Sequence, residues 1–257
     1  MTEQRIAIIP DLQVPLHDQR SVDLVLEWLS DFQPDLLVNV GDDADMTQIS
    51  RWVRGRKDEY VGGLQRDLDA TRRVHGLFRE AVGPDCEYVV KRSNHVDRFE
   101  HYLSRGAPAF TDLRVLNVPD LLGYTEHGIT YADKGPYPFA PGWVVAHGDE
   151  GSLIQTAGGT AMNLAQRWGK SVVCGHTHRF GLQHKHHVVN GKIVGELFGF
   201  EVGHLMDLKR AGYLKAGYGN WQQGVGAMLV IDGHVHLHPL PIRNRRLYWE
   251  GVEYRGR

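Results

Sequence analysis

A cluster of acidic residues, Asp42, Asp43 and Asp45, is the part of this sequence that points most directly to chemistry. It follows Gly41 and the short apolar run 36–40, which predicts a buried parallel strand that ends in a sharp turn. Carboxylates packed this closely repel one another, and a bound cation relieves the repulsion. An acidic turn that caps a helix is the alternative interpretation, so this segment alone does not establish a metal site.

Four other predicted strands also end in side chains that commonly bind metals. In open sheets of alternating strands and helices, sites form at the carboxyl ends of the strands. Each of these side chains alone is compatible with a helix cap, a turn or a buried histidine, but five in the same structural position predict a shared site. In chain order the residues are Asp11 with Gln13, Asp42, Asn94 with His95, His147, and His176 with His178.

The hydrophobic pattern predicts the elements that position these residues. Strands are expected at 5–9 and 36–40, and the apolar residues between 22 and 32 repeat at helical spacing after Asp18, a suitable N-cap. Such a unit predicts a right-handed crossover between parallel strands. Further strands are expected at 86–90, 143–146 and 171–174, and further helices at 64–78, 97–105 and 157–168.

The last third of the chain predicts antiparallel hairpins instead. Asn190-Gly191 and Asp232-Gly233 each join two apolar runs, which is a strong hairpin signal. Histidines that alternate along a strand share one face and can bind a metal, but no carboxylate lies on the same predicted strands, so half-exposed strand faces are the preferred interpretation. These histidines are His184, His186 and His187 in one hairpin, and His234, His236 and His238 in the other.

Length and composition set further limits. With 257 residues, 42% hydrophobic and 23% charged, the chain fits a single domain over 1–257, with a cap or insertion at about 106–128 and a solvated basic tail at about 241–257. The net charge of −2 gives no overall attraction to nucleic acid. Because no long apolar run or signal-peptide pattern is present, a cytoplasmic protein without membrane attachment is predicted. Cys86 and Cys174 are expected to be buried free thiols.

Taken in order, the five motifs resemble those of a known superfamily. They are Asp11-Leu12-Gln13, Gly41-Asp42-Asp43-Ala44-Asp45, Ser93-Asn94-His95-Val96-Asp97, His147-Gly148 and Gly175-His176-Thr177-His178. The calcineurin-like metallophosphoesterases carry Asp-x-His, Gly-Asp-x-x-Asp, Gly-Asn-His-Asp/Glu, His-Gly and Gly-His-x-His, each after a strand, and the resemblance covers residues 6–240. The Asp-Leu-Gln opening is similar to that of members encoded by bacteriophages and prophages.

This resemblance implies an α/β fold of two mixed β-sheets packed face to face with helices outside, a four-layer αββα sandwich. It also implies two divalent metal ions that share Asp42, with Mn²⁺ expected first and Fe, Zn²⁺ or Ni²⁺ as alternatives. Carboxylate, amide and imidazole ligands without a thiolate agree with Mn²⁺, Fe or Zn²⁺. Metal one is expected to bind Asp11, Gln13, Asp42 and His178, and metal two Asp42, Asn94, His147 and His176.

The resemblance also implies roles for three further residues. His95 is expected to be the general acid that protonates the leaving oxygen, and Asp45 to orient His95. Arg98 is expected to meet the substrate phosphate, with a surface salt bridge as the alternative. Two positions depart from the family pattern. Gln13 replaces the usual metal-one histidine and is a weaker donor to a transition metal, and Ser93 replaces a glycine.

The predicted function is therefore hydrolysis of a phosphoester, with two metals that activate a bridging water for in-line attack. A diester substrate, such as a cyclic nucleotide or a nucleic-acid end, is favoured over a phosphomonoester of a nucleotide or phosphoprotein. A catalytically silent binding module on the same fold is the third alternative. The natural substrate, the native metals and the oligomeric state are left open by the sequence.

Overall fold

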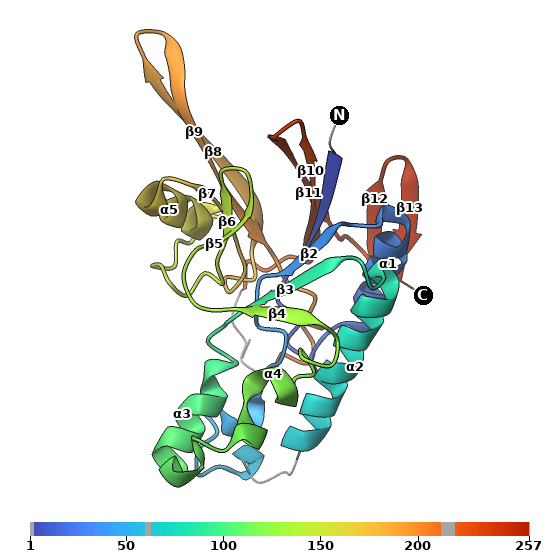
Figure 1. Ribbon diagram of the computed structural model, residues 1–257, viewed down its shortest axis with the longest axis vertical. Coiled ribbons are helices and arrows are strands. Elements are labelled where there is room, and N and C mark those ends of the chain that lie inside the picture. Colours follow the sequence, from blue (N-terminus) through green and yellow to red (C-terminus); the bar gives the residue numbers. More distant parts are fainter. Residues whose placement is uncertain (1–2, 60–62, 212–218, 257) are drawn as a thin grey trace.

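Two β-sheets form the centre of the protein (Figure 1). The computed structural model describes residues 3–59, 63–211 and 219–256. The first sheet contains β1 (Glu3–Ile9), β2 (Leu36–Asn39), β3 (Glu87–Lys91), β4 (Ile129–Ala132), β10 (Gly224–Ile231) and β11 (His234–Pro241). The second contains β5 (Tyr137–Ala140), β6 (Trp143–Val145), β7 (Ser171–Cys174), β8 (Phe180–Val189) and β9 (Lys192–Val202).

Both sheets are mixed, as expected. In the first, whose order is β11-β10-β1-β2-β3-β4, strands β1 to β4 are parallel, while β10 is antiparallel to both of its neighbours. In the second, whose order is β5-β6-β7-β9-β8, strands β6, β7 and β9 are parallel and the two edge strands antiparallel. The carboxyl ends of the central parallel strands of each sheet therefore lie at one edge of that sheet.

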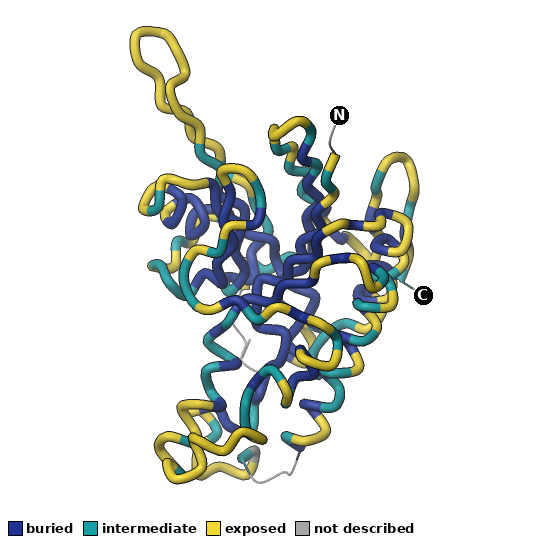
Figure 2. The backbone as a smooth tube through the Cα atoms, viewed as in Figure 1, coloured by how far each residue is buried: buried dark blue, intermediate teal, exposed yellow. Residues whose placement is uncertain are grey.

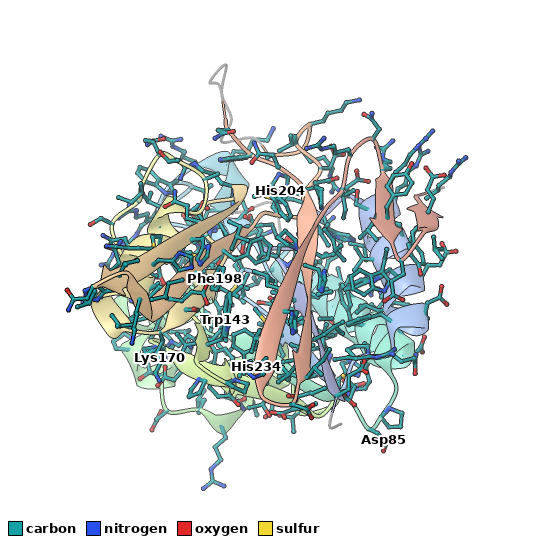
Figure 3. The ribbon with its side chains drawn as sticks, turned by 90° about the horizontal axis from the view of Figure 1, so that it is seen from above. Asp85, Trp143, Lys170, Phe198, His204 and His234 are labelled. Carbon is teal, nitrogen blue, oxygen red and sulfur yellow. The ribbon has the colours of Figure 1, made fainter. Side chains whose placement is uncertain are left out.

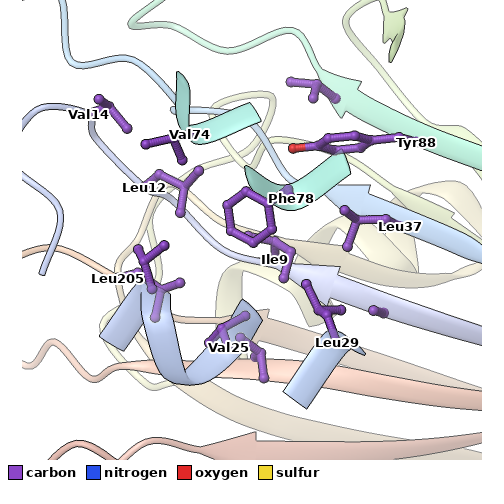
Figure 4. Close-up of a cluster of buried hydrophobic side chains, with 14 of the residues drawn as sticks. Ile9, Leu12, Val14, Val25, Leu29, Leu37, Val74, Phe78, Tyr88 and Leu205 are labelled. Atoms are coloured by element: carbon purple, nitrogen blue, oxygen red, sulfur yellow. The ribbon is translucent and has the colours of Figure 1, made fainter. Parts of the chain in front are cut away.

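Three separate hydrophobic layers establish the four-layer order. Between the sheets, Ile6 and Ile8 of β1 pack in one cluster with Phe200 of β9. The opposite face of β1, with Ile9, belongs to a larger cluster under helices α1 (Gln19–Phe32) and α2 (Leu64–Val82) (Figure 4). A third cluster joins Val172 of β7 to helix α5 (Gly159–Trp168). Helix, sheet, sheet and helix thus follow one another, and the predicted αββα sandwich is confirmed.

Helix α1 begins and ends where the sequence predicts. Its N-cap Asp18 accepts a hydrogen bond from the backbone N–H of Arg20 at 3.2 Å, and Gln33 ends the helix in a left-handed conformation with φ 47°. Its apolar residues at helical spacing are buried, except for the half-buried Leu26. The crossover from β1 through α1 to β2 therefore brings two strand ends side by side, with Ile9 paired to Asn39.

The segment 106–128, expected to be a cap or insertion, follows helix α3 (Asp97–Gly106) and consists of short helical turns (Figure 1). These are two 3₁₀ turns, Pro108–Phe110 and Arg114–Leu116, and helix α4 (Val118–Leu121). Most of its first half is exposed, whereas Leu122 and Tyr124 are fully buried in the cluster beneath α2. The segment is thereby anchored to the main core at one end.

The last third of the chain contains the β8–β9, β10–β11 and C-terminal hairpins. The outer part of the β8–β9 hairpin extends beyond its sheet and is exposed along most of its length (Figure 2). The C-terminal residues, expected to be a solvated tail, instead form the hairpin β12 (Arg246–Trp249) and β13 (Val252–Arg255), whose Leu247 and Tyr254 are buried against α1. Cys86 and Cys174 are buried free thiols, as predicted. No helix within the described ranges is long and apolar enough to span a membrane.

Candidate metal centre

The acidic turn after β2 begins at Gly41, a position at which there is no space for a side chain. Gly41 has φ 100°, and a Cβ atom there would lie 2.8 Å from the carbonyl oxygen of Lys91 and 2.8 Å from Cβ of Ser93. Asp42 follows with φ 50°, a left-handed conformation that is uncommon for a residue other than glycine. Three further candidate ligands share this conformation: Gln13 at φ 54°, His176 at φ 64° and His178 at φ 57°. Such backbone outliers cluster at functional sites.

One group of possible ligands combines Asp11, Asp42 and His178. Each offers an atom, and these atoms all lie within 4.8 Å of one another. His178 Nε2 lies 3.1 Å from Asp11 Oδ2, and all three residues are buried. These residues follow β1, β2 and β7, so the group draws on both sheets. It matches three of the four residues predicted for metal one.

The fourth residue of that set, Gln13, lies beside Asp42. Its Nε2 donates to Asp42 Oδ2 at 3.0 Å, while its Oε1 is buried and has no hydrogen-bond partner. The Asp42 carboxylate fixes this orientation, because the opposite one would place the amide oxygen against a negative charge. The free Gln13 oxygen and the unpaired Asp11 Oδ1 are buried acceptors that lack donors, an arrangement that a cation satisfies.

A second group combines Asp42 with His147 and His176, whose ligand atoms also lie within 4.8 Å of one another. His147 Nε2 lies 3.3 Å from Asp42 Oδ1 and 3.0 Å from Asn94 Oδ1. On the other side of the ring, Nδ1 lies 2.9 Å from the carbonyl oxygen of Val40, to which it donates its proton. This contact leaves Nε2 as the coordinating atom. The sequence-predicted ligands of metal two therefore lie together, and Asp42 belongs to both groups.

The pKa values of several ionisable groups in the centre are strongly shifted. Burial, reinforced by the charge of Asp42, raises the pKa of Asp11 to about 7. Burial opposes charge on His147, but the Asp42 carboxylate outweighs it and raises the pKa of that imidazole to about 10. Burial also lowers the pKa of His178 to about 3, which keeps this ring neutral. Protonated His147 thus stands where a metal would place positive charge, and metal binding must release its Nε2 proton.

His95 lies at the edge of this centre. Its Nδ1 is 3.4 Å from Asp45 Oδ1, its Nε2 is 3.7 Å from Asp42 Oδ2, and its backbone N–H donates to Asp42 Oδ1 at 3.3 Å. Burial by itself raises the pKa of Asp45, but the contact with His95 and a hydrogen bond from Thr47 outweigh burial and lower it. The structure therefore brings Asp45 and His95 together in the relation predicted for an oriented imidazole.

Arg98 connects His95 to the exterior. One guanidinium nitrogen, Nη2, lies 2.7 Å from His95 Nε2, and the other, Nη1, donates to the backbone carbonyl of Asp45 at 2.5 Å. Beyond it, a cavity of about 450 Å³ is bounded by Asn94, Arg98 and residues of the 49–59 segment and α3. Its cationic and aromatic lining includes Arg51, Trp52, Arg54, Arg98, Tyr102 and Arg105.

One buried histidine near the centre was missed by the sequence analysis. His204 pairs with Asp11 through a β-bridge, and its ring centre lies 5.8 Å from that of His178. Its Nδ1 accepts the backbone N–H of Met206 at 2.9 Å, so the proton of the neutral ring is on Nε2 and the ring is a donor rather than a ligand. The available signal was its position directly after β9, which extends to Val202.

Comparison with known proteins gives clear relatives among bacteriophage proteins. The gene 54 protein of Mycobacterium phage L5 is 35% identical over 254 residues, which cover 96% of this chain and 97% of the relative. The gene 54 protein of Mycobacterium phage D29 is 35% identical over 253 residues, with the same coverage. No protein-family model matches the chain.

Solved structures are similar at much lower identity. Vps29 of Chaetomium thermophilum is 11% identical with a TM-score of 0.49, and covers 99% of this chain and 96% of its own. Vacuolar protein sorting 29 of Cryptosporidium parvum is 13% identical with a TM-score of 0.48, and the match covers 99% of this chain and 100% of the Cryptosporidium chain. The identity to the phage proteins confirms the predicted relationship to phage-encoded proteins. This chain belongs to the family of the mycobacteriophage gene 54 proteins, and in it the ordered motifs of a calcineurin-like metallophosphoesterase meet at one buried centre.

Proposed function

We propose that this chain is a dinuclear metal-dependent phosphodiesterase that acts on cyclic nucleotides or nucleic-acid ends. The observation that carries the proposal is that two ligand groups, buried except for the half-buried His176, share Asp42 directly beside His95. Asp11, Gln13, Asp42 and His178 would hold one divalent ion, and Asp42, Asn94, His147 and His176 the other. Carboxylate, amide and imidazole donors without a thiolate suit Mn²⁺ first, with Fe, Zn²⁺ or Ni²⁺ as alternatives.

When bound, two such ions supply a water of lowered pKa and neutralise the phosphate oxygens. The protein side chains then have to handle the leaving group. In the structure His95 Nε2 lies 2.7 Å from Nη2 of Arg98, which can only donate a hydrogen bond, so the acid role requires Arg98 to turn towards the substrate and Nε2 to take up a proton. Asp45, whose Oδ1 lies 3.4 Å from Nδ1, would then accept a hydrogen bond from the Nδ1 proton. As the P–O bond breaks, that Nε2 proton passes to the leaving oxygen, and Asp45 stabilises the imidazolium before the transfer.

Arg98 is the proposed contact for a phosphate oxygen that the metals do not reach. Its guanidinium already lies at the mouth of the arginine-lined cavity, next to the proposed acid. Four arginines around about 450 Å³ favour a substrate with more than one phosphate or with a phosphodiester backbone. Trp52, a residue that is 67% exposed, offers a ring face on which a base can stack.

The test begins with metal-free protein to which Mn²⁺ is added back. Hydrolysis of bis-p-nitrophenyl phosphate faster than p-nitrophenyl phosphate supports the diesterase, and the reverse order supports a monoesterase. No hydrolysis of either ester by protein that carries its full complement of metal refutes an enzymatic function. The Asp42→Asn protein, measured beside it, reports any contaminating activity.

The cavity is tested separately with a short single-stranded oligonucleotide. Arg54→Ala and Trp52→Ala are expected to raise KM for the oligonucleotide several-fold and to leave hydrolysis of the small diester unchanged, because the small ester does not extend into the cavity. Arg73→Ala removes an exposed arginine on α2 and is the matched control. Equal effects of the cavity variants on both substrates would contradict a binding role for the cavity.

A further inference from the structure

A third cluster of ligand-type side chains lies on the exposed β8–β9 hairpin, apart from the buried centre. It contains His184 and His186 of β8 and Glu196 of β9, and their ligand atoms all lie within 4.8 Å of one another. His184 Nε2 is 2.5 Å and His186 Nε2 is 3.0 Å from the same oxygen, Glu196 Oε1. Two imidazole nitrogens and one carboxylate oxygen therefore converge on a single point.

Strand geometry explains why they converge. His184 and His186 are two residues apart on one strand and project from the same face. Glu196 is the direct antiparallel partner of His186, so its side chain stands on that face as well. The neighbouring His187, one residue along, lies on the opposite face. This explains why the sequence analysis found no carboxylate: the partner is supplied by strand pairing across the hairpin.

The cluster is held in place by a stack of rings that begins in the core. His184 stacks on Phe198 with ring centres 4.2 Å apart and planes 6° apart. Phe198 in turn stacks on the buried Trp143 of β6 at 5.5 Å and 15° (Figure 3). One imidazole is thereby fixed against the second sheet, which distinguishes this cluster from histidines that rotate freely on a surface.

We propose that His184, His186 and Glu196 form a separate binding site for a transition-metal ion, with Zn²⁺ as the best match. Imidazole and carboxylate together are a usual ligand set for Zn²⁺, and a tetrahedral site with bonds near 2.0 Å separates its ligand atoms by about 3.3 Å. To reach that separation, the contacts at 2.5 and 3.0 Å need to open by about 0.8 and about 0.3 Å. The fourth position is open to water or to a ligand from another molecule.

The proposed metal ion joins the two strands of the hairpin. Outer hairpin residues are exposed, and an isolated two-stranded hairpin is marginally stable in water. A metal ion bound to both β8 and β9 restrains this part of the chain, because metal binding contributes its free energy to the folded hairpin. The site does not depend on the proposed phosphodiesterase, since none of its residues belongs to the buried centre.

The test is a Zn²⁺ titration of full-length, metal-free protein against a chromophoric chelator. His186→Ala and Glu196→Gln are each expected to bind one equivalent fewer than wild type, or to bind that equivalent at least about tenfold more weakly. His187→Ala, which removes a histidine from the opposite face of the same strand, is the matched control and should retain it. If His186→Ala and Glu196→Gln both bind Zn²⁺ with the stoichiometry and affinity of wild type, the proposal is overturned.

Hydrogen exchange supplies a readout that does not depend on counting metals. Addition of Zn²⁺ is expected to slow amide exchange in the outer part of β8 and β9 in wild type and in His187→Ala, but not in His186→Ala. Zn²⁺ should protect the strand ends around the buried centre equally in all three proteins, which shows that each is folded. Protection of the hairpin in His186→Ala would also overturn the site.

Discussion

The carboxylate of Asp42 accepts a hydrogen bond from Gln13 Nε2 on one oxygen and lies 3.3 Å from His147 Nε2 with the other. It therefore faces both ligand groups. Asp42→Asn keeps the shape of the side chain but removes its charge. We expect it to abolish hydrolysis and to weaken both metals by at least about 10–100-fold, as measured by metal content after dialysis. Loss of only one metal would show that Asp42 is not shared.

His95→Ala is expected to leave the content of both metals unchanged while slowing turnover by about 10²–10⁴-fold, the usual contribution of a positioned general acid. The loss should be smaller for esters with nitrophenyl leaving groups, which need little protonation, than for alkyl esters. The comparison of kcat for the two ester types measures this directly. An equal loss for both would indicate that His95 positions the substrate instead.

Gln13→His tests the position at which this chain departs from the family pattern. Imidazole is a stronger donor to Mn²⁺ or Zn²⁺ than an amide oxygen, so metal one should bind more tightly in the variant. Titration of metal-free wild type and variant side by side gives the two affinities. Identical affinities would mean that residue 13 does not contact the metal.

At the level of single residues, the sequence predicted the site residues that belong to local motifs. Asp11, Asp42, His147 and His178 follow strand ends, and strand ends can be recognised from the apolar runs before them. Glu196 could not be recognised in that way, because its relation to His184 and His186 depends on the register between two strands. Register is a property of the folded hairpin, which local residue types specify only weakly.

Among the elements, the turn after β7 leaves no space for a side chain. A Cβ atom on Gly175 would lie 2.1 Å from Asp11 Oδ1 and 2.5 Å from Val40 Cγ2. Gly175→Ala is therefore expected to displace the Asp11 carboxylate, weaken metal one, and destabilise the fold by about 1–3 kcal/mol. Metal titration and urea unfolding measure the two effects. Gly106→Ala, at a glycine with neither a positive φ nor any atom close to the added Cβ, is the matched control.

The elements around the acidic turn are tied together by a buried polar network. Asp43 Oδ2 accepts a hydrogen bond from Tyr124 at 2.7 Å and lies 2.8 Å from His75 Nε2 of α2. His75 Nδ1 lies in turn 2.9 Å from the hydroxyl of Tyr88 on β3. The carboxylate of Asp43 is thus hydrogen-bonded to Tyr124 and His75, which explains why Asp43 belongs to neither ligand group.

For the molecule as a whole, the buried amine of Lys91 predicts how stability depends on pH. The amine donates to the carbonyl oxygens of Asp133 and Gly135, and burial lowers its pKa from 10.5 to about 8. Between these values the unfolded chain binds the proton more strongly, so the contribution of Lys91 to stability rises with pH. It is complete above about 10.5 and is lost as pH falls through 8.

The measurement is the free energy of urea unfolding at pH 7 and pH 10 for wild type and Lys91→Met. Tyrosine and cysteine titrations affect both proteins alike, so the difference between them isolates the amine. That difference should shift in favour of wild type at the higher pH. A difference that does not change with pH would show that the amine has an ordinary pKa in the folded protein.

Sequence patterns predicted most of the architecture, but only where neighbours along the chain pair or pack. The β1–α1–β2 unit and both hairpin turns were predicted correctly because short connections determine them. The pairing of β10 with β1, which joins Ile6 to Met228, has no local signal. Packing of the C-terminal hairpin on α1 was also missed, because the two segments are far apart in the sequence. The many arginines of this segment predicted a solvated tail, although Leu247 and Tyr254 are buried.

The proposed metal ligands come from both sheets, so the order in which the sheets dock and the metals bind can be predicted. Asp11, Asp42 and Asn94 follow strands of the first sheet, whereas His147, His176 and His178 follow strands of the second. Neither sheet alone carries a complete set for either proposed ion. Metal capture is therefore expected to follow docking of the sheets, and bound ions then oppose their separation. Because the metal contacts would form only after the sheets have docked, they stabilise the folded state more than the transition state for folding. Chelation should therefore speed unfolding far more than it slows refolding.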